Sequence, residues 1–181
     1  MIIVSDTSPI TNLAAISQLD LLQKLYTSII IPTAVYNEMV KVDKVVPGAV
    51  EVQTLPWIQQ QTVVDSQRVI VIQENEENID LGEAEAIALA LELKADLLLM
   101  DERRGRIVAS SYGLQITGLL GVLLQAKRQI LIPSVKILLD KMIEKADFRV
   151  SKELYSTIIQ AAGESLGLRV IHPEKVLIVF V

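Results

Sequence analysis

The sequence predicts an α/β fold of three layers, α/β/α, with a mainly parallel central sheet. Apolar residues make up 51% of the chain but aromatic residues only 4%, so the core must consist of Ile, Leu, Val and Ala. Such side chains are typical of parallel strands that are covered on both faces. Short apolar runs also alternate with segments of helical periodicity, an order that favours a parallel sheet with helices on both faces.

The first part of the chain begins with a β-branched run at 2–5, which we expect to be a buried strand. Ser8 and Pro9 are preferred at the N-cap and at the first helical position, so a helix should begin there and end near Ile16. We expect a helix at 19–25, a strand at 28–31 and a helix at 33–42. After the break at Pro47-Gly48, residues 49–75 are harder to assign; we expect a helix, then extended segments, with a strand at 69–72.

The second part follows an acidic loop at 74–80 and is more regular. Its expected elements are a helix at 82–94, a strand at 97–100, a helix at 103–112 capped by Gly113, a strand at 114–117, and helices at 119–128, 134–145 and 151–162. We expect one domain over 1–181, with a core at about 2–120 and C-terminal helices at about 119–163. An apolar tail at 176–181 is interpreted as an edge strand, with a partner-binding segment as the alternative.

Composition limits the possible metal sites and compartments. The chain has no cysteine and a single histidine, His172, which excludes disulfides, thiolate sites and multi-histidine sites within one chain. Any metal must bind oxygen ligands, which favours Mg²⁺ or Mn²⁺. The net charge of −5 argues mildly against nucleic acid as a partner. No apolar run is long enough to span a membrane, and Asp6 interrupts the N-terminal run early, so we expect a cytoplasmic protein without a membrane partner.

Two aspartates follow predicted strands. Asp6 comes after the first strand and Asp101 after the strand at 97–100, and in open parallel sheets ligands bind outside the carboxyl ends of the strands. Asp101 could instead cap the helix that follows it. Asp6 has a weaker structural explanation, because Ser8 is the better cap for its helix.

Two glutamates are expected near apolar helix faces. Glu83 lies about 40° from Ile87, at the edge of a core stripe, whereas Glu85 and Glu92 fall on the opposite face and are expected to be solvated. Glu83 could also be a first-turn acid stabilised by the helix dipole. Glu38 sits among apolar residues of its helix, where a buried carboxylate needs a partner such as a salt bridge or a metal. Four acids on four elements would repel one another unless a divalent cation neutralises them.

These residues resemble the PIN-domain family, mainly over residues 2–120. The similarity rests on Asp6-Thr7-Ser8 after the first strand, Ile31-Pro32 followed by Glu38, Glu83-Ala84 at a helix start, and Asp101 18 residues later. Segments 101–106 and 117–121 resemble a prokaryotic branch of that family.

The resemblance implies a metal-dependent endoribonuclease acting on single-stranded RNA, often the toxin of a VapBC-type toxin–antitoxin pair. Asp6, Glu38, Glu83 and Asp101 would then hold one or two Mg²⁺ or Mn²⁺ ions and activate a water molecule, and Ser8 would orient a ligand or a phosphate. It further implies a homodimer and a small antitoxin partner.

The chain differs from the usual PIN-domain pattern at two positions, and it carries several basic residues near Asp101. Glu83 stands where aspartate is commoner, and Leu99 stands where many members have threonine or serine. Arg103 and Arg104 follow Asp101 and are candidates for phosphate contacts, since arginine suits bidentate recognition; pairing with neighbouring acids is the alternative explanation, and it applies equally to Arg106.

Two other functions remain open. One is a PIN-like scaffold with little catalysis that binds a protein or nucleic acid. The other is a different Mg²⁺-dependent α/β enzyme, against which Ser8 counts because a haloacid-dehalogenase-type phosphatase needs aspartate there. A receiver domain would need an acidic pair where the chain has Ser5-Asp6.

Overall fold

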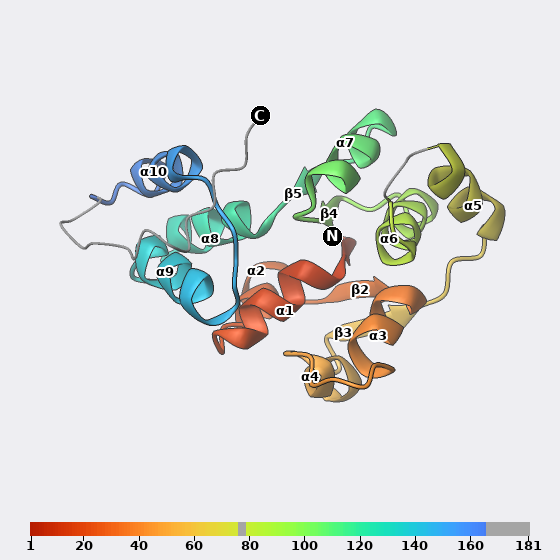
Figure 1. The fold of residues 1–181 in the computed structure, drawn as a ribbon, viewed down its shortest axis with the longest axis horizontal. Coiled ribbons are helices and arrows are strands. Elements are labelled where there is room, and N and C mark those ends of the chain that lie inside the picture. The colour runs from red at the N-terminus through yellow and green to blue at the C-terminus, as the bar shows by residue number, and fades with distance from the viewer. Residues whose placement is uncertain (76–78, 166–181) are drawn as a thin grey trace.

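The computed structural model describes residues 1–75 and 79–165, and these contain one five-stranded, fully parallel sheet in the order β3-β2-β1-β4-β5 (Figure 1). The strands are β1 (Ile3–Ser5), β2 (Ile29–Pro32), β3 (Ile58–Gln61), β4 (Leu97–Leu99) and β5 (Ile116–Thr117). The predicted α/β class with a parallel sheet between helices is therefore confirmed. His172 and the tail at 176–181 lie outside the described residues.

Side chains that alternate along the strands supply both faces of the sheet. Ile3, Ile31 and Leu99 join one apolar cluster, whereas Val4 and Leu98 join the other, because successive strand side chains point to opposite faces. Because both faces are buried, the strand sequences are continuous apolar runs and do not alternate between apolar and polar residues.

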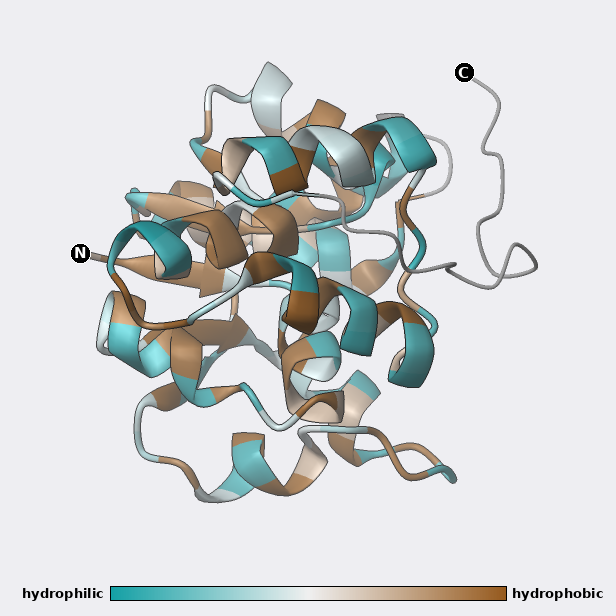
Figure 2. Cartoon of the chain, turned by 90° about the vertical axis from the view of Figure 1, so that its left-hand side faces the viewer, coloured by the Kyte–Doolittle hydropathy of each residue, from teal (hydrophilic) through white to brown (hydrophobic). Residues whose placement is uncertain are grey.

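Each face is covered by its own group of helices (Figure 1). The first cluster lies under α1 (Thr7–Ala15), α2 (Asp20–Tyr26), α8 (Leu119–Arg128), α9 (Val135–Lys145) and α10 (Lys152–Ala161), and it extends to α3 (Thr33–Val40) and α4 (Ala49–Thr54). The second lies under α5 (Ser66–Asn75), α6 (Leu81–Glu92) and α7 (Arg103–Ser111). The helices carry hydrophilic and hydrophobic segments in alternation, as expected for covering layers (Figure 2).

The predicted strand at 69–72 is wrong, because this segment belongs to helix α5. Val69 and Ile72, three residues apart, are buried, while Ile70 and Val71 between them are exposed, which is the spacing of a helix that packs on one side. The segment packs on α6, and this tertiary contact outweighs the weak strand preference of four β-branched residues.

The helices of the C-terminal part begin and end close to the predicted positions. Ser134 and Ser151 cap α9 and α10 by accepting hydrogen bonds from the backbone N–H groups of Ile137 and Leu154. None of the helices in the described part of the chain is long and apolar enough to cross a membrane.

Candidate active site

Asp6 and Asp101 lie at the same edge of the sheet, because β1 and β4 are adjacent parallel strands whose last residues, Ser5 and Leu99, pair. Asp6 follows β1 directly, and its backbone N–H donates to the Leu99 carbonyl oxygen at 2.9 Å. Asp101 follows β4 after one intervening residue, Met100. Parallel strands thus bring two residues 95 positions apart in the sequence to one end of the molecule.

An acidic cavity of about 310 Å³ opens at this edge. We use this name for the space lined by residues from the end of β1, from α1 and α3, and from the starts of α6 and α7: Asp6, Thr7, Ser8, Thr11, Glu38, Asp80, Glu83 and Glu102. Five of these residues are acids and none is basic. The fold therefore gathers three of the four acids expected from the sequence around one space.

Glu83 is a buried acid with one carboxylate oxygen that receives no hydrogen bond. Its side chain is 4% exposed, and its Oε1 atom is buried without a hydrogen-bond partner. Oε2 accepts a bond from the backbone N–H of Asp80 at 3.2 Å, which completes a capping box at the start of α6. Burial, opposed by this bond and reinforced by the carboxylates of Asp80, Glu102 and Glu38, raises the pKa of Glu83 to about 7.

Asp6 is also buried, at 5% exposure. Burial raises its pKa to about 7; a hydrogen bond from the backbone of Thr7 opposes the rise, and Asp80, Glu83 and Glu38 add to it. Contrary to the expectation that Ser8 caps the first helix, α1 begins at Thr7 and Asp6 is its N-cap residue, without a side-chain capping bond. The Asp6 carboxylate is thus not used to cap the helix, and Asp6 lines the acidic cavity.

Glu38 reaches the cavity from α3. Its Oε2 accepts a short bond of 2.6 Å from the Thr7 hydroxyl, and the backbone of Gly82 supplies another donor. A Cβ atom at Gly82 would collide with the Glu38 carboxylate, so only glycine allows this approach. The pKa of Glu38 is raised by burial, with Asp80 and Glu85 as further causes.

Asp101 lies beside the acidic cavity rather than in its lining. Its Oδ1 accepts a bond of 2.7 Å from the backbone N–H of Leu119, and its Oδ2 accepts one of 3.2 Å from the Ser8 hydroxyl. The expectation that Asp101 could cap the helix after it is wrong, since Glu102 occupies that N-cap position; Asp101 instead binds the first N–H of α8. Burial raises its pKa, while these bonds and the Arg106 charge oppose the rise.

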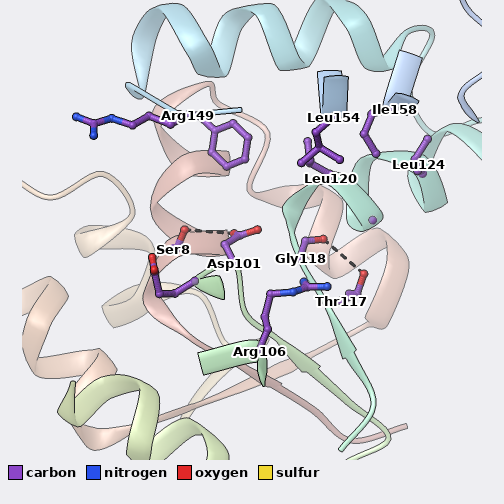
Figure 3. Close-up of a pocket in the computed structure, with 13 residues that line it drawn as sticks. Ser8, Asp101, Arg106, Thr117, Gly118, Leu120, Leu124, Arg149, Leu154 and Ile158 are labelled. Atoms are coloured by element: carbon purple, nitrogen blue, oxygen red, sulfur yellow. Dashed lines mark hydrogen bonds between the residues drawn. The ribbon is translucent and has the colours of Figure 1, made fainter. Parts of the chain in front are cut away.

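A second cavity, of about 590 Å³, adjoins the first and shares Ser8 and Glu102 with it. Asp101 belongs to this second space, together with residues of β5, α8 and α10 (Figure 3). Ser8, in the first turn of α1, thus lines both cavities, and its hydroxyl donates to Asp101.

The sequence analysis did not single out two acids and Arg149 of these cavities, and it named Arg106 only as a basic residue beside the site. Asp80 could have been found from the spacing of its capping box with Glu83, three residues later; Glu102 carries no such signal. Arg106 and Arg149 line the second cavity, whereas Arg103 and Arg104 are exposed and line neither cavity. The orientation of α7 about its own axis decides that Arg106, rather than Arg103 or Arg104, faces the second cavity.

Glu85 and Glu92, which we expected to be solvated charges, are half-buried and accept hydrogen bonds from neighbouring backbone. Glu85 accepts a bond of 2.8 Å from the backbone N–H of Ala34 in the first turn of α3. Glu92 accepts bonds from the backbone N–H groups of Val64 and Asp65. Helix α6 packs against both α3 and α5. The backbone N–H groups next to it need acceptors, and Glu85 and Glu92 supply them.

The donor set of the acidic cavity fits a hard divalent cation in type and charge. Its ligands are carboxylate oxygens, and the unpartnered Oε1 of Glu83 is a buried acceptor without a donor. Protein hydrogen bonds hold the Glu38 and Glu83 carboxylates, and within 1–75 and 79–165 no three acidic or histidine side chains form a ready coordination group. Asp6, Glu38, Asp80 and Glu83 are the residues that could hold such an ion after side-chain rotation.

Comparison with known proteins gives a family match. A family model described as a PIN domain matches residues 2–164. This segment includes every residue that lines the two cavities. No curated protein and no solved structure matches the chain.

Proposed function

Because the family model covers nearly the whole length, the chain belongs to the PIN-domain family, and from this premise we propose that it is a metal-dependent endoribonuclease that hydrolyses single-stranded RNA. The cofactor would be Mg²⁺ or Mn²⁺. On the family resemblance alone, we extend the proposal to a homodimeric toxin of a toxin–antitoxin pair, inhibited by a small antitoxin protein. PIN domains are generally nucleases, and this coarser assignment follows from the family.

The observation that carries the proposal is the convergence of Asp6, Glu38 and Glu83 on one cavity at the carboxyl edge of a parallel sheet. Two of the three have a pKa raised to about 7, mainly by burial. A fold does not retain such repulsive carboxylates for stability, because burying unpaired acids costs free energy. Perturbed acids in a cavity are instead typical of functional sites.

A divalent ion, when bound, would neutralise the carboxylates and make a water molecule more acidic. Asp6, Glu38 and Glu83 would hold the ion, with Asp80 close enough to contribute. Glu83 would contribute Oε1, its unpartnered oxygen, because no protein donor competes for that atom. Ser8 would keep Asp101 oriented through its hydroxyl, and Arg106, which donates to the Met100 carbonyl oxygen, would offset negative charge beside Asp101.

A catalytically weak PIN-like scaffold that binds protein or nucleic acid is the second candidate. One observation favours it. Leu99, at the position where a hydroxyl residue is common in the family, is fully buried in the apolar cluster and offers no polar atom to the site. A scaffold would bind RNA without cleaving it.

The test is cleavage of a labelled, unstructured RNA with Mg²⁺, with Mn²⁺ and with a chelator. The wild type should cleave only with metal, and Asp6→Asn should lose at least about 100-fold in rate, because even the loss of a group that only orients a metal ligand costs roughly 10- to 100-fold. Asp20→Asn is the matched control, because Asp20 is an exposed acid paired with Lys24 on α2. Metal-independent cleavage, or equal rates for Asp6→Asn and the control, would refute the proposed site.

A further inference from the structure

The second cavity differs from the acidic cavity in both chemistry and shape. Part of its wall is apolar and comes from α8, α10 and the segment between α9 and α10: Leu120, Leu124, Phe148, Leu154 and Ile158. The polar part carries Asp101, Arg106 and Thr117. Figure 3 shows the leucines and Ile158 grouped on one side, with Asp101 and Arg106 facing them from the sheet edge.

Charge also separates the two spaces. The acidic cavity is lined by five acids and no base, whereas the second cavity is lined by two acids and two arginines, Arg106 and Arg149. Arg106 reaches toward Thr117 and Gly118, and Arg149 extends outward at the rim (Figure 3). Of the two cavities, only the second therefore offers positive charge to a phosphate.

The shared residues fix the relation between the cavities. Ser8 and Glu102 line both, so the two cavities are adjacent at the same edge of the sheet. The volume of about 590 Å³ is within the range of roughly 300–1,000 Å³ that is common for small-molecule pockets. A nucleobase suits such a mixed wall, because its faces are apolar and its edges carry donors and acceptors.

We propose that the second cavity is a nucleotide subsite, which takes up the base of a nucleotide next to the phosphodiester held at the acidic cavity. The base packs against Leu120, Leu154 and Phe148, and its edge faces Thr117 and Asp101. Arg149 contacts its phosphate at the rim. This subsite rests on the proposed RNA-directed function, and it assigns to the C-terminal helices a role in holding single-stranded RNA.

The test measures binding without cleavage. A short, labelled, single-stranded oligoadenylate is titrated with the full-length protein in the presence of a chelator, and affinity is followed by fluorescence anisotropy. Arg149→Gln and Leu154→Ala should each weaken binding roughly three- to tenfold. Their matched controls are Arg128→Gln, an exposed arginine at the end of α8, and Ile137→Ala, an apolar residue on α9 that is 53% exposed where Leu154 is 44% exposed. Neither control residue lines either of the two cavities described above.

An abasic scan separates a base pocket from a general effect on RNA. Oligonucleotides with one abasic residue at successive positions should show one position where the wild type loses about tenfold in affinity. At that position Leu154→Ala should lose much less, because its pocket is already damaged. A loss that is equal at all positions, or the same in Leu154→Ala as in the wild type, would overturn the subsite.

These outcomes are independent of the nuclease test. Position-dependent binding without cleavage would support the subsite and refute the proposed nuclease function. Metal-dependent cleavage by variants that bind RNA like their controls would support the nuclease and overturn the subsite. The latter result would also be expected if the cavity instead receives an apolar segment of a partner protein.

Discussion

Replacing Asp6 by asparagine should make the protein more stable at neutral pH while it removes the proposed activity. The side chain is 5% exposed, and burial together with nearby acids raises its pKa from 3.8 to about 7. Asparagine has nearly the same shape and keeps an oxygen that can accept from the backbone of Thr7. The substitution therefore removes the unfavourable charge with little change in packing.

The size of the effect follows from the pKa. One pKa unit corresponds to about 1.4 kcal/mol, so ionised Asp6 lowers the free energy of unfolding by roughly 4 kcal/mol relative to a neutral group. A raised pKa means that the folded state binds the proton more tightly. The stability linked to this proton is present below the unfolded pKa of about 4, is lost as the pH rises, and is gone above about 7.

The assay is denaturant unfolding with a chelator at about pH 5 and about pH 8. At the higher pH, Asp6→Asn should be more stable than the wild type by up to roughly 4 kcal/mol, and at the lower pH by less than half of that. Added Mg²⁺ or Mn²⁺ should stabilise the wild type and not the variant. The control Asp20→Asn should change stability by less than about 0.5 kcal/mol at both pH values.

One result would refute this reasoning. If wild type and Asp6→Asn lose stability in parallel between the two pH values, the Asp6 carboxyl does not carry the expected proton. Glu83, whose pKa is also raised to about 7, would then be the group to test by the same series with Glu83→Gln.

Three further predictions concern residues that stabilise the elements around the site and the C-terminal helices. Gly105→Ala should destabilise the protein by about 1–3 kcal/mol in denaturant unfolding, because its Cβ would lie 2.6 Å from Glu83 Oε1 and 2.5 Å from the sulfur of Met100; unchanged stability would show that α7 can shift freely. Glu85→Gln should lower the free energy of unfolding by about 0.5–1 kcal/mol, since it removes a negative charge from the first turn of α3; an effect no larger than that of exposed Glu144→Gln would contradict this role. Burial alone would raise the pKa of Glu164, but hydrogen bonds from Ser134 and the backbone of Lys136 and Val135 outweigh it and lower this pKa to about 2. Glu164 should therefore contribute stability that is present above about pH 4.5 and is lost as the pH falls toward 2. Acid unfolding of Glu164→Gln should lack that part of the transition, and an identical acid profile in wild type and variant would contradict it.

The local patterns of the chain were sufficient for most elements but not for 69–72. Short apolar runs and segments of helical periodicity located β1, β2, β4 and the helices from α6 onward. Burial of one or both sides of an element makes apolar residues recur with the period of that element. The run Val69-Ile70-Val71-Ile72 has the composition of a strand, yet it packs as a helix on α6. Local preference is too small to decide a segment whose burial comes from packing on another element.

The sequence by itself determined the acids and their edge of the sheet. A residue that directly follows a buried parallel strand must lie at the carboxyl edge, so Asp6 and Asp101 were placed by chain order alone, and the helical angle from Ile87 placed Glu83 near the core. Only the tertiary structure decided which of them face the same space. The start of α8, which follows β5, gives Asp101 the N–H of Leu119, and Asp101 lines the second cavity rather than the acidic cavity that Asp6, Glu38 and Glu83 share. The second cavity, lined from five elements by residues as distant as Ser8 and Ile158, likewise has no local pattern, because its shape depends on how helices pack together rather than on any one of them.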